Sequence, residues 1–318
     1  MYGALIGDYV GSRFEFNNIK SKDFELFHKD CRYTDDTVMT LAIKSAIDTI
    51  INPKDTDLYE DAFLYTGTTP VNIADERKRI IVDAMQYWGK VFPGKGYGGS
   101  FSNWLASDDP KPYNSWGNGS AMRVSYVGWV FKTLYQTEKY ARMTAEVTHN
   151  HPEGIKGAVT TAGCVYLARK KYPKWFIKRY VMSKGYKLRP CDEVRPTYRF
   201  DVSCQGTIPV AVEAFLESTD FEDAIRTAIS MGGDSDTIGA ITGAIAEAYY
   251  GMNELFNNKV EEILKDIDRQ HKQYLDREHK LNEYFVDESF DDIEMSDENT
   301  KLDNDVIEGQ ITIDELFL

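Results

Sequence analysis

The sequence of 318 residues contains little cysteine, no long apolar run and no leader-like start. Its four cysteines form neither a Cys-x-x-Cys pair nor a zinc-ligand spacing, which argues against a disulfide framework and a structural zinc site. No stretch is long enough to cross a bilayer, and the first residues lack the basic and apolar segments of a signal peptide. We therefore expect a cytoplasmic protein with no membrane partner.

Basic residues are fewer than acidic ones, and the excess negative charge is concentrated near one end of the chain. The net charge is -14, and residues 283–318 account for -12 of it through 13 acidic residues and one lysine. Neither this segment nor the nearly neutral remainder has the basic footprint of a nucleic-acid-binding protein, so we expect no direct nucleic-acid partner. Hydrophobic residues make up 42% of the chain, which is enough for a sizeable core.

The alternation of apolar and polar residues that marks a β-strand is missing through residue 250. Apolar and small residues recur at helical spacing instead. Gly3, Gly7 and Gly11, for example, are spaced by four, which leaves one helix face bare and permits the close approach of another helix. The sequence therefore predicts an all-α body over residues 1–285. Residues 286–318 form an acidic tail with the composition of a disordered segment.

Two stretches far apart in the sequence combine carboxylates and hydroxyls at the start of a predicted helix. One is Thr34-Asp-Asp-Thr37, and the other is Gly232-Gly-Asp-Ser-Asp-Thr237, which leads into a run of small residues. The aspartates of the first stretch have an alternative role as simple helix caps. Adjacent carboxylates repel one another, however, and hard divalent cations prefer oxygen ligands. We interpret the two stretches as halves of one metal site.

Two glycine-rich stretches predict loops whose backbone amides face a ligand. Residues 93–101 contain four glycines, which is weak evidence alone. Gly117, Gly119 and Ser120 precede a predicted helix start near Ala121, and free amides together with the helix dipole favour an anion such as phosphate there. The spacing matches neither a P-loop nor a dinucleotide-binding fingerprint.

Three further side chains suggest a ligand site. Glu15 ends a helix that looks buried, where a carboxylate needs a partner or a task. His149 and His151 lie beside Pro152, and no cysteine or third histidine nearby completes a zinc site. We expect these histidines to hydrogen-bond a ligand, the alternative being two solvent-facing residues at a helix start.

These pieces together resemble the ADP-ribosylglycohydrolase family, which includes the dinitrogenase reductase-activating glycohydrolase. They occur in family order and cover roughly residues 1–285. The segment Phe200–Pro209 also resembles a bacterial branch of the family. The matching pieces are Gly3–Asp8 through Glu15, Thr34–Thr37, Gly117–Arg123, Thr148-His149 and Gly232–Thr237.

The resemblance implies a compact orthogonal bundle of helices that holds two divalent cations, usually Mg²⁺ or Mn²⁺. It implies metal ligation from both stretches, by Thr34, Asp35, Asp36, Asp234, Asp236 and Thr237. It places Glu15 near the scissile bond, where Glu15 or a metal-bound aspartate (Asp35 or Asp36) would transfer a proton. The implied substrate-binding residues are Tyr97, Gly98, Gly99, Ser100, Gly117, Asn118, Gly119, Ser120, Met122, His149 and His151. Ser120 departs from the glycine that many members have.

The expected reaction is hydrolysis of the glycosidic bond between ADP-ribose and a protein side chain or small molecule. Two metals would clamp the 2- and 3-hydroxyls of the distal ribose, and a positioned water would attack through an oxocarbenium-like state. Two other classes stay open: a two-metal phosphohydrolase, and a module that binds ADP-ribose without cleaving it. The sequence does not select the linkage.

The last nine residues change from acidic to amphipathic. Gln310, Ile313, Leu316 and Phe317 fit the spacing of peptides that dock on replication sliding clamps, although Leu316 stands where an aromatic residue is usual. The alternative is an amphipathic end without a partner, because a short motif has a high false-positive risk.

Overall fold

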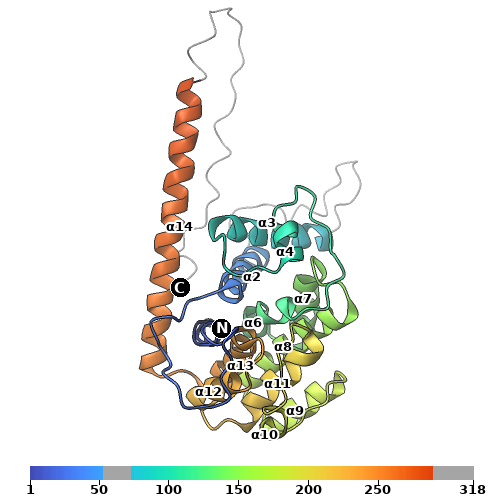
Figure 1. The fold of residues 1–318 in the computed structure, drawn as a ribbon. Helices are drawn as coiled ribbons and strands as arrows, with labels where there is room; N and C mark the ends of the chain where they lie inside the picture. Colours follow the sequence, from blue (N-terminus) through green and yellow to red (C-terminus); the bar gives the residue numbers. More distant parts are fainter. Residues whose placement is uncertain (53–72, 289–318) are drawn as a thin grey trace, which may run out of the picture. The chain divides into compact units, whose positions relative to one another are not determined.

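The computed structural model describes residues 1–52 and 73–288 of the chain (Figure 1). Within these residues the regular secondary structure is helical, and an isolated β-bridge joins Gly117 to Ser203. The expectation of an all-α fold is therefore confirmed. None of the helices in the described ranges is long and apolar enough to span a membrane.

The helices are numbered in chain order. Their bounds are α1 Gly3–Gly11, α2 Asp35–Ile51, α3 Ile73–Val91, α4 Gly99–Leu105, α5 Gly119–Met122, α6 Ser125–Val130, α7 Leu134–Glu146, α8 Pro152–Arg169, α9 Lys174–Ser183, α10 Cys191–Val194, α11 Cys204–Glu217, α12 Phe221–Ser230, α13 Ser235–Tyr250 and α14 Glu254–Glu288.

The chain divides into two compact units, Met1–Ile263 and Leu264–Leu318. The first unit holds α1 to α13 and the start of α14, and every candidate site residue is in it. In the second unit the description covers the rest of α14. Most of the predicted acidic tail and the four residues of the clamp-like motif lie outside the described residues.

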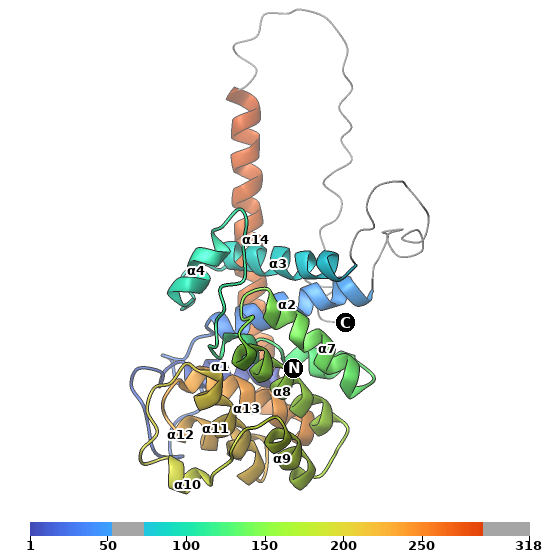
Figure 2. The ribbon, with the colours of Figure 1, turned by 90° about the vertical axis from the view of Figure 1, so that its right-hand side faces the viewer.

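Helix α13 is the central helix of the first unit (Figures 1 and 2). It contacts α1, α2, α5, α6, α8, α11 and α12. Its side chains from Ser235 to Ala246 are buried without exception, which is why this helix is apolar or small on every face. The small residues let several helices approach its axis at once.

The bare face of α1 lies directly against α13, as the glycine spacing predicted. A Cβ atom on Gly3 would lie 2.2 Å from the carbonyl oxygen of Gly243, and one on Gly7 would lie 1.9 Å from that of Gly239. A Cβ on Gly11 would lie 2.5 Å from the Cα of Asp236. The two helices run antiparallel, so the end of α1 meets the start of α13.

Helix α1 ends at Gly11, so Glu15 does not end this helix as expected but follows it. The chain then turns, and the side-chain amide of Asn18 donates to the carbonyls of Phe14 and Glu15 at 2.6 and 2.9 Å. Asn18 also bonds Gly233 in both directions, with Nδ2 to the Gly233 carbonyl at 2.9 Å and the Gly233 amide to Oδ1 at 2.7 Å. The turn that carries Glu15 is thereby attached to the loop before α13.

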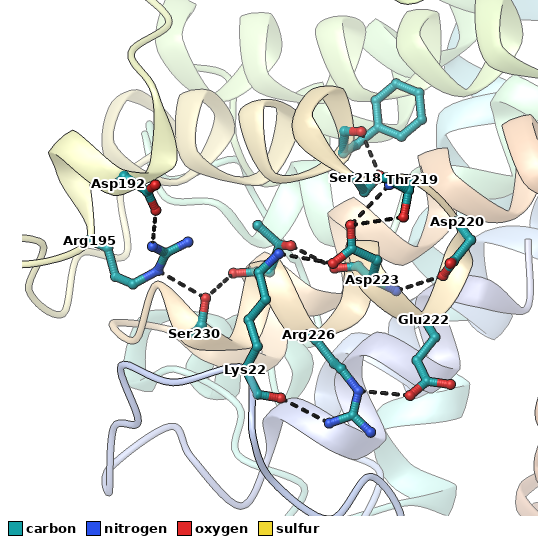
Figure 3. A network of polar contacts seen from close by, with 12 residues as sticks. Lys22, Asp192, Arg195, Ser218, Thr219, Asp220, Glu222, Asp223, Arg226 and Ser230 are labelled. Carbon is teal, nitrogen blue, oxygen red and sulfur yellow. Dashed lines mark hydrogen bonds and ion pairs between the residues drawn. The ribbon is translucent and has the colours of Figure 1, made fainter.

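Polar contacts from α12 hold the segment that follows this turn (Figure 3). Lys22 pairs with Asp223 at 2.9 Å, and the Arg226 guanidinium donates to the Lys22 carbonyl at 3.0 Å. The same guanidinium also donates to the Phe24 carbonyl at 2.7 Å. Because α12 packs on α13, these contacts fix the path of the chain between Glu15 and Thr34. Both residues are therefore positioned by the same central helix.

We expect Gly7→Ala to lower the free energy of unfolding by at least about 2 kcal/mol, because the added methyl group overlaps the backbone of α13. Gly99→Ala is the matched control, since a Cβ there meets nothing within 4 Å and its cost should stay within about 0.5 kcal/mol. Urea unfolding followed by circular dichroism measures both. Equal stability of the two variants would contradict the close packing of α1 on α13.

Candidate functional site

The first half of the site is the start of α2. Thr34 is the N-cap of this helix, and its hydroxyl accepts from the Asp36 amide at 3.4 Å. Asp36 is buried, and its Oδ1 atom has no hydrogen-bond partner. Asp35 is only partly buried, and its backbone amide donates to the Lys95 carbonyl at 2.9 Å. The capping role is therefore filled by Thr34, which leaves both carboxylates available for another role.

Asp8 of α1 organises this helix start, and sequence reasoning gave it no role. Its Oδ2 accepts from the amides of Thr34 and Thr37 at 2.9 and 3.0 Å and from the Thr37 hydroxyl. Its Oδ1 accepts from the Thr34 hydroxyl at 2.7 Å. The residue is fully buried. The signal was present in the sequence, because a carboxylate on a helix with a bare glycine face requires a partner, as we argued for Glu15.

The second half of the site is the start of α13. Gly232 and Gly233 adopt left-handed backbone conformations with φ of 66° and 76°, which turn the chain sharply before Asp234. The Thr237 hydroxyl donates to Asp36 Oδ2 at 3.3 Å, so the two halves are in direct contact. The structure therefore brings together the two oxygen-rich stretches that the sequence singled out.

Two overlapping groups of carboxylates are arranged so that they could hold metal ions. One comprises Asp8, Asp36 and Asp236, and the other comprises Glu15, Asp234 and Asp236. Within each group the ligand atoms lie within 4.8 Å of one another. Asp236 belongs to both groups, and Asp35 belongs to neither.

Burial and mutual repulsion shift the titration of these groups in one direction. Burial, together with the charge of Asp236, raises the pKa of Asp35 and Asp36 well above its usual range. Burial likewise raises the pKa of Asp234 to about 6. Burial first, and then the charge of Asp236, raises the pKa of Glu15 to about 7. The cluster concentrates negative charge where water screens it poorly.

The residues present fit a divalent cation. Carboxylates and threonine hydroxyls are hard oxygen donors, which Mg²⁺ and Mn²⁺ prefer. The unpartnered Asp36 Oδ1 is a buried acceptor that lacks a proton donor, and a buried polar group without a partner is costly. A bound cation would satisfy this atom and offset the repulsion between the carboxylates.

The Gly117–Met122 segment lies against the second half of the site. Asn118 donates from Nδ2 to Asp234 Oδ2 at 2.6 Å and to the Thr207 hydroxyl at 3.0 Å. The Thr237 hydroxyl is 3.8 Å from the sulfur of Met122. Ser120 is fully buried, and its hydroxyl donates to the Gly154 carbonyl at 2.8 Å. The Ser120 hydroxyl is therefore used in a hydrogen bond within the fold. At this position only the backbone of the segment can contact a ligand.

The two histidines have different environments. His149 is buried, its Nδ1 is 2.7 Å from the Thr148 hydroxyl, and its Nε2 faces the Gly117–Gly119 backbone, 3.2 Å from where a Cβ of Gly119 would lie. Burial lowers the pKa of His149 well below its usual range. His151 is instead the N-cap of α8, where Nδ1 accepts from the Glu153 amide at 3.1 Å. His151 therefore caps a helix start and is half-buried, whereas His149 is buried.

Arg123 adds to the effect of burial, because its positive charge also lowers the pKa of His149. The guanidinium is buried and donates to the Thr144 carbonyl at 2.9 Å and to the Thr148 hydroxyl at 2.8 Å. Because the Thr148 oxygen accepts from Arg123, its own proton is free to be donated to His149 Nδ1. When Thr148 donates to Nδ1, the proton of the neutral ring sits on Nε2, the atom that faces the Gly117–Gly119 loop.

The 93–101 loop borders the start of α2. A Cβ on Gly96 would lie 3.3 Å from Asp35 Oδ1, so the Asp35 side chain is directed toward this loop. The Tyr97 hydroxyl donates to the Phe92 carbonyl at 2.9 Å. Gly98, Gly99 and Ser100 are exposed at the start of α4, and no atom crowds the two glycines. The loop is thus open to a ligand at its tip.

The chain is similar to known proteins in sequence and in fold. The sequence model of the ADP-ribosylglycohydrolase family matches residues 1–288. The chain is 27% identical over 330 residues to ADP-ribosylhydrolase ARH3 of Homo sapiens, which covers 80% of this chain and 85% of that protein. It is 22% identical over 300 residues to ADP-ribosyl-[dinitrogen reductase] glycohydrolase of Rhodospirillum rubrum, covering 86% and 92%. A solved structure, described as an ADP-ribosylglycohydrolase-related protein complex, shares the fold with a TM-score of 0.56 at 21% identity over 85% of this chain and 95% of that chain.

We expect Asp8→Ala to cost about 3 kcal/mol of unfolding free energy or more, because two buried amides and two buried hydroxyls lose their acceptor. Asp223→Ala is the control: this aspartate also accepts several hydrogen bonds, but it is partly exposed and should cost about 1 kcal/mol or less. Chemical denaturation of the metal-free protein measures both, and similar costs would show that Asp8 does not organise the start of α2.

Proposed function

The chain belongs to the ADP-ribosylglycohydrolase family, and on that premise we propose that it hydrolyses the glycosidic bond between ADP-ribose and a modified target. The observation that carries the proposal is the contact between two oxygen-rich helix starts around the unpartnered Asp36 Oδ1. The names of the relatives from Homo sapiens and Rhodospirillum rubrum support the same reaction class. The target, which is a protein side chain or a small molecule, carries the leaving group.

Two divalent cations, Mg²⁺ or Mn²⁺, are proposed to be held by Thr34, Asp35, Asp36, Asp234, Asp236 and Thr237. Two overlapping carboxylate groups that share Asp236 support a count of two. Such cations would supply a positively charged clamp for the 2- and 3-hydroxyls of the distal ribose. Asp8 is proposed to orient Thr34, since both Asp8 oxygens already accept hydrogen bonds. A hydroxyl that donates its proton to Asp8 presents its lone pairs to a cation.

Glu15 is proposed as the residue that moves a proton during the reaction. Water attacks the anomeric carbon, the bond to the target breaks, and one proton of that water ends on the leaving atom. Glu15 is half-buried beside Asp236, and burial together with the Asp236 charge raises its pKa to about 7 in the metal-free protein. A carboxyl group with a raised pKa is suited to accept and donate a proton near neutral pH. Asp35 and Asp36 are further candidates for the same role.

The ADP portion is proposed to lie along the Gly117–Met122 segment. Backbone amides of Gly117, Asn118, Gly119 and Ser120 would face the pyrophosphate, and His149 would donate from Nε2 to a ligand oxygen beside that loop. Met122 would contact the ribose next to Thr237. Tyr97, Gly98, Gly99 and Ser100 would line the opposite side near Asp35, and His151 would lie farther out at the start of α8.

The assignments of a cytoplasmic location, a body ending at residue 285 and a sliding-clamp partner remain predictions from the sequence. The clamp partner has the least support, since it depends on four residues outside the described part of the chain. A pull-down with full-length protein and with protein lacking Leu316 and Phe317 tests it.

We expect the protein to release free ADP-ribose from an ADP-ribosylated arginine or serine peptide when Mg²⁺ or Mn²⁺ is present. Chelation should abolish the release, and added metal should restore it, because the carboxylate cluster is otherwise uncompensated. Chromatographic detection of ADP-ribose measures the outcome. Binding of ADP-ribose without release from any linkage would favour a binding module, and phosphate release from nucleotides would favour a phosphohydrolase.

We expect Glu15→Gln to lower kcat by at least about 100-fold, because the amide cannot exchange a proton. Mg²⁺ affinity, measured by calorimetry, should fall less than in Asp236→Asn, because Glu15 belongs to one carboxylate group and Asp236 belongs to both. Glu25→Gln is the control, since Glu25 is exposed on the segment that follows the same turn. Full turnover by Glu15→Gln with intact metal binding would remove Glu15 from the catalytic role.

A further inference from the structure

Two exposed phenylalanines form a stacked pair next to the candidate site. Phe16 directly follows Glu15 and is 81% exposed, and Phe200 is 49% exposed. Their ring centroids are 6.0 Å apart, and the ring planes differ by 24°. Single exposed aromatic residues are ordinary on a protein surface. This pair is more unusual, because the two rings come from segments far apart in the sequence. Although they stack on each other, both rings keep much of their apolar surface in water.

Each ring is attached to an element that carries a site residue. Phe16 belongs to the turn that Asn18 ties to the Gly233 backbone, immediately before Asp234. Phe200 lies in the segment before α11, where the Val202 carbonyl accepts from the Asn118 amide at 2.7 Å and the Ser203 amide donates to Asp201 at 2.8 Å. The pair therefore connects the turn that carries Glu15 with the segment that contacts Asn118. Because both backbones are anchored, the two side chains lose little conformational entropy when a ligand binds to them.

The surroundings of the pair favour an apolar partner over an anionic one. The ammonium group of Lys20 donates to the carbonyls of Met231 and Tyr198, and Arg199 donates to those of Pro196 and Tyr198. The Arg13 guanidinium lies 5.0 Å above the neighbouring Phe14 ring. These flanking cations are thus engaged with the protein itself. The rings also lie beside Glu15, the residue assigned to the bond between ADP-ribose and its target.

We propose that Phe16 and Phe200 form a docking platform for the polypeptide that carries the ADP-ribose, contacting apolar side chains next to the modified residue. This proposal depends on the hydrolase function proposed above and adds the substrate class: modified protein in preference to a modified free amino acid. Aromatic rings supply large contact areas at low entropic cost and are enriched among the residues that dominate binding interfaces. The rest of the site recognises ADP-ribose, which all such substrates share.

The test compares Phe16→Ala, Phe200→Ala and the double variant with wild type on two substrates. One is an ADP-ribosylated protein, and the other is the same linkage on a free amino acid. The double variant should lose about tenfold in kcat/KM on the protein, mainly through KM, because the platform is absent. On the free amino acid, and in the affinity for ADP-ribose, it should match wild type within about twofold. Trp175→Ala is the control, since Trp175 is 65% exposed on α9 and should affect neither substrate.

Several outcomes would overturn the platform. An equal loss on both substrates with weaker ADP-ribose binding would assign the pair to the adenine, and no loss on either would make it a passive surface. A loss restricted to an ADP-ribosylated oligonucleotide, assayed as a third substrate, would assign it to nucleic acid. If wild type hydrolyses no substrate, the proposed function fails, and binding decides the platform separately: tighter binding of ADP-ribosylated protein than of ADP-ribose, lost in the double variant, supports it, and equal binding overturns it.

Discussion

The backbone contact between α1 and α13 is the constraint on which the site depends. Three glycines of α1 face the backbone of α13 at distances that exclude any side chain. The helices are antiparallel, so this contact delivers the end of α1, and with it Glu15, to the start of α13, where Asp234 and Asp236 are found. A larger separation would pull the carboxylate groups apart. The glycine face of α1 thus brings several carboxylates close together at the start of α13.

Asp8 extends this constraint to a third helix. It lies on α1 between Gly7 and Gly11 and accepts four hydrogen bonds from Thr34 and Thr37 at the start of α2. A fully buried carboxylate is costly, and burial raises its pKa. Four donors from one helix start offset much of that cost and fix the direction of the Thr34 hydroxyl. The ends of three helices are therefore held by packing and by one hydrogen-bonded carboxylate before any cation binds.

The sequence predicted the parts of this arrangement that depend on local pattern. Glycines spaced by four indicated the close helix contact, and the two oxygen-rich stretches were identified as partners. The role of Asp8 was missed, although its burial could have been inferred from the same glycine face. His149 contacts the Thr148 hydroxyl, which accepts from Arg123 at the end of α5, and periodicity does not report such contacts. The path of the chain after Gly11 is held by a contact between distant segments, Asn18 with Gly233.

The rigidity of the centre has a consequence for specificity. Residues that are packed backbone to backbone or held by several hydrogen bonds cannot be substituted without loss of the site. The centre of the site can therefore recognise only the chemical group that all substrates share. Differences between targets must then be recognised by residues that the packing leaves free. Phe16 and Phe200 satisfy this condition, because their rings are exposed while their backbones are anchored to the turn at Asn18 and the segment before α11. An exposed side chain on an anchored backbone can change its contacts with the target without disturbing the carboxylates behind it.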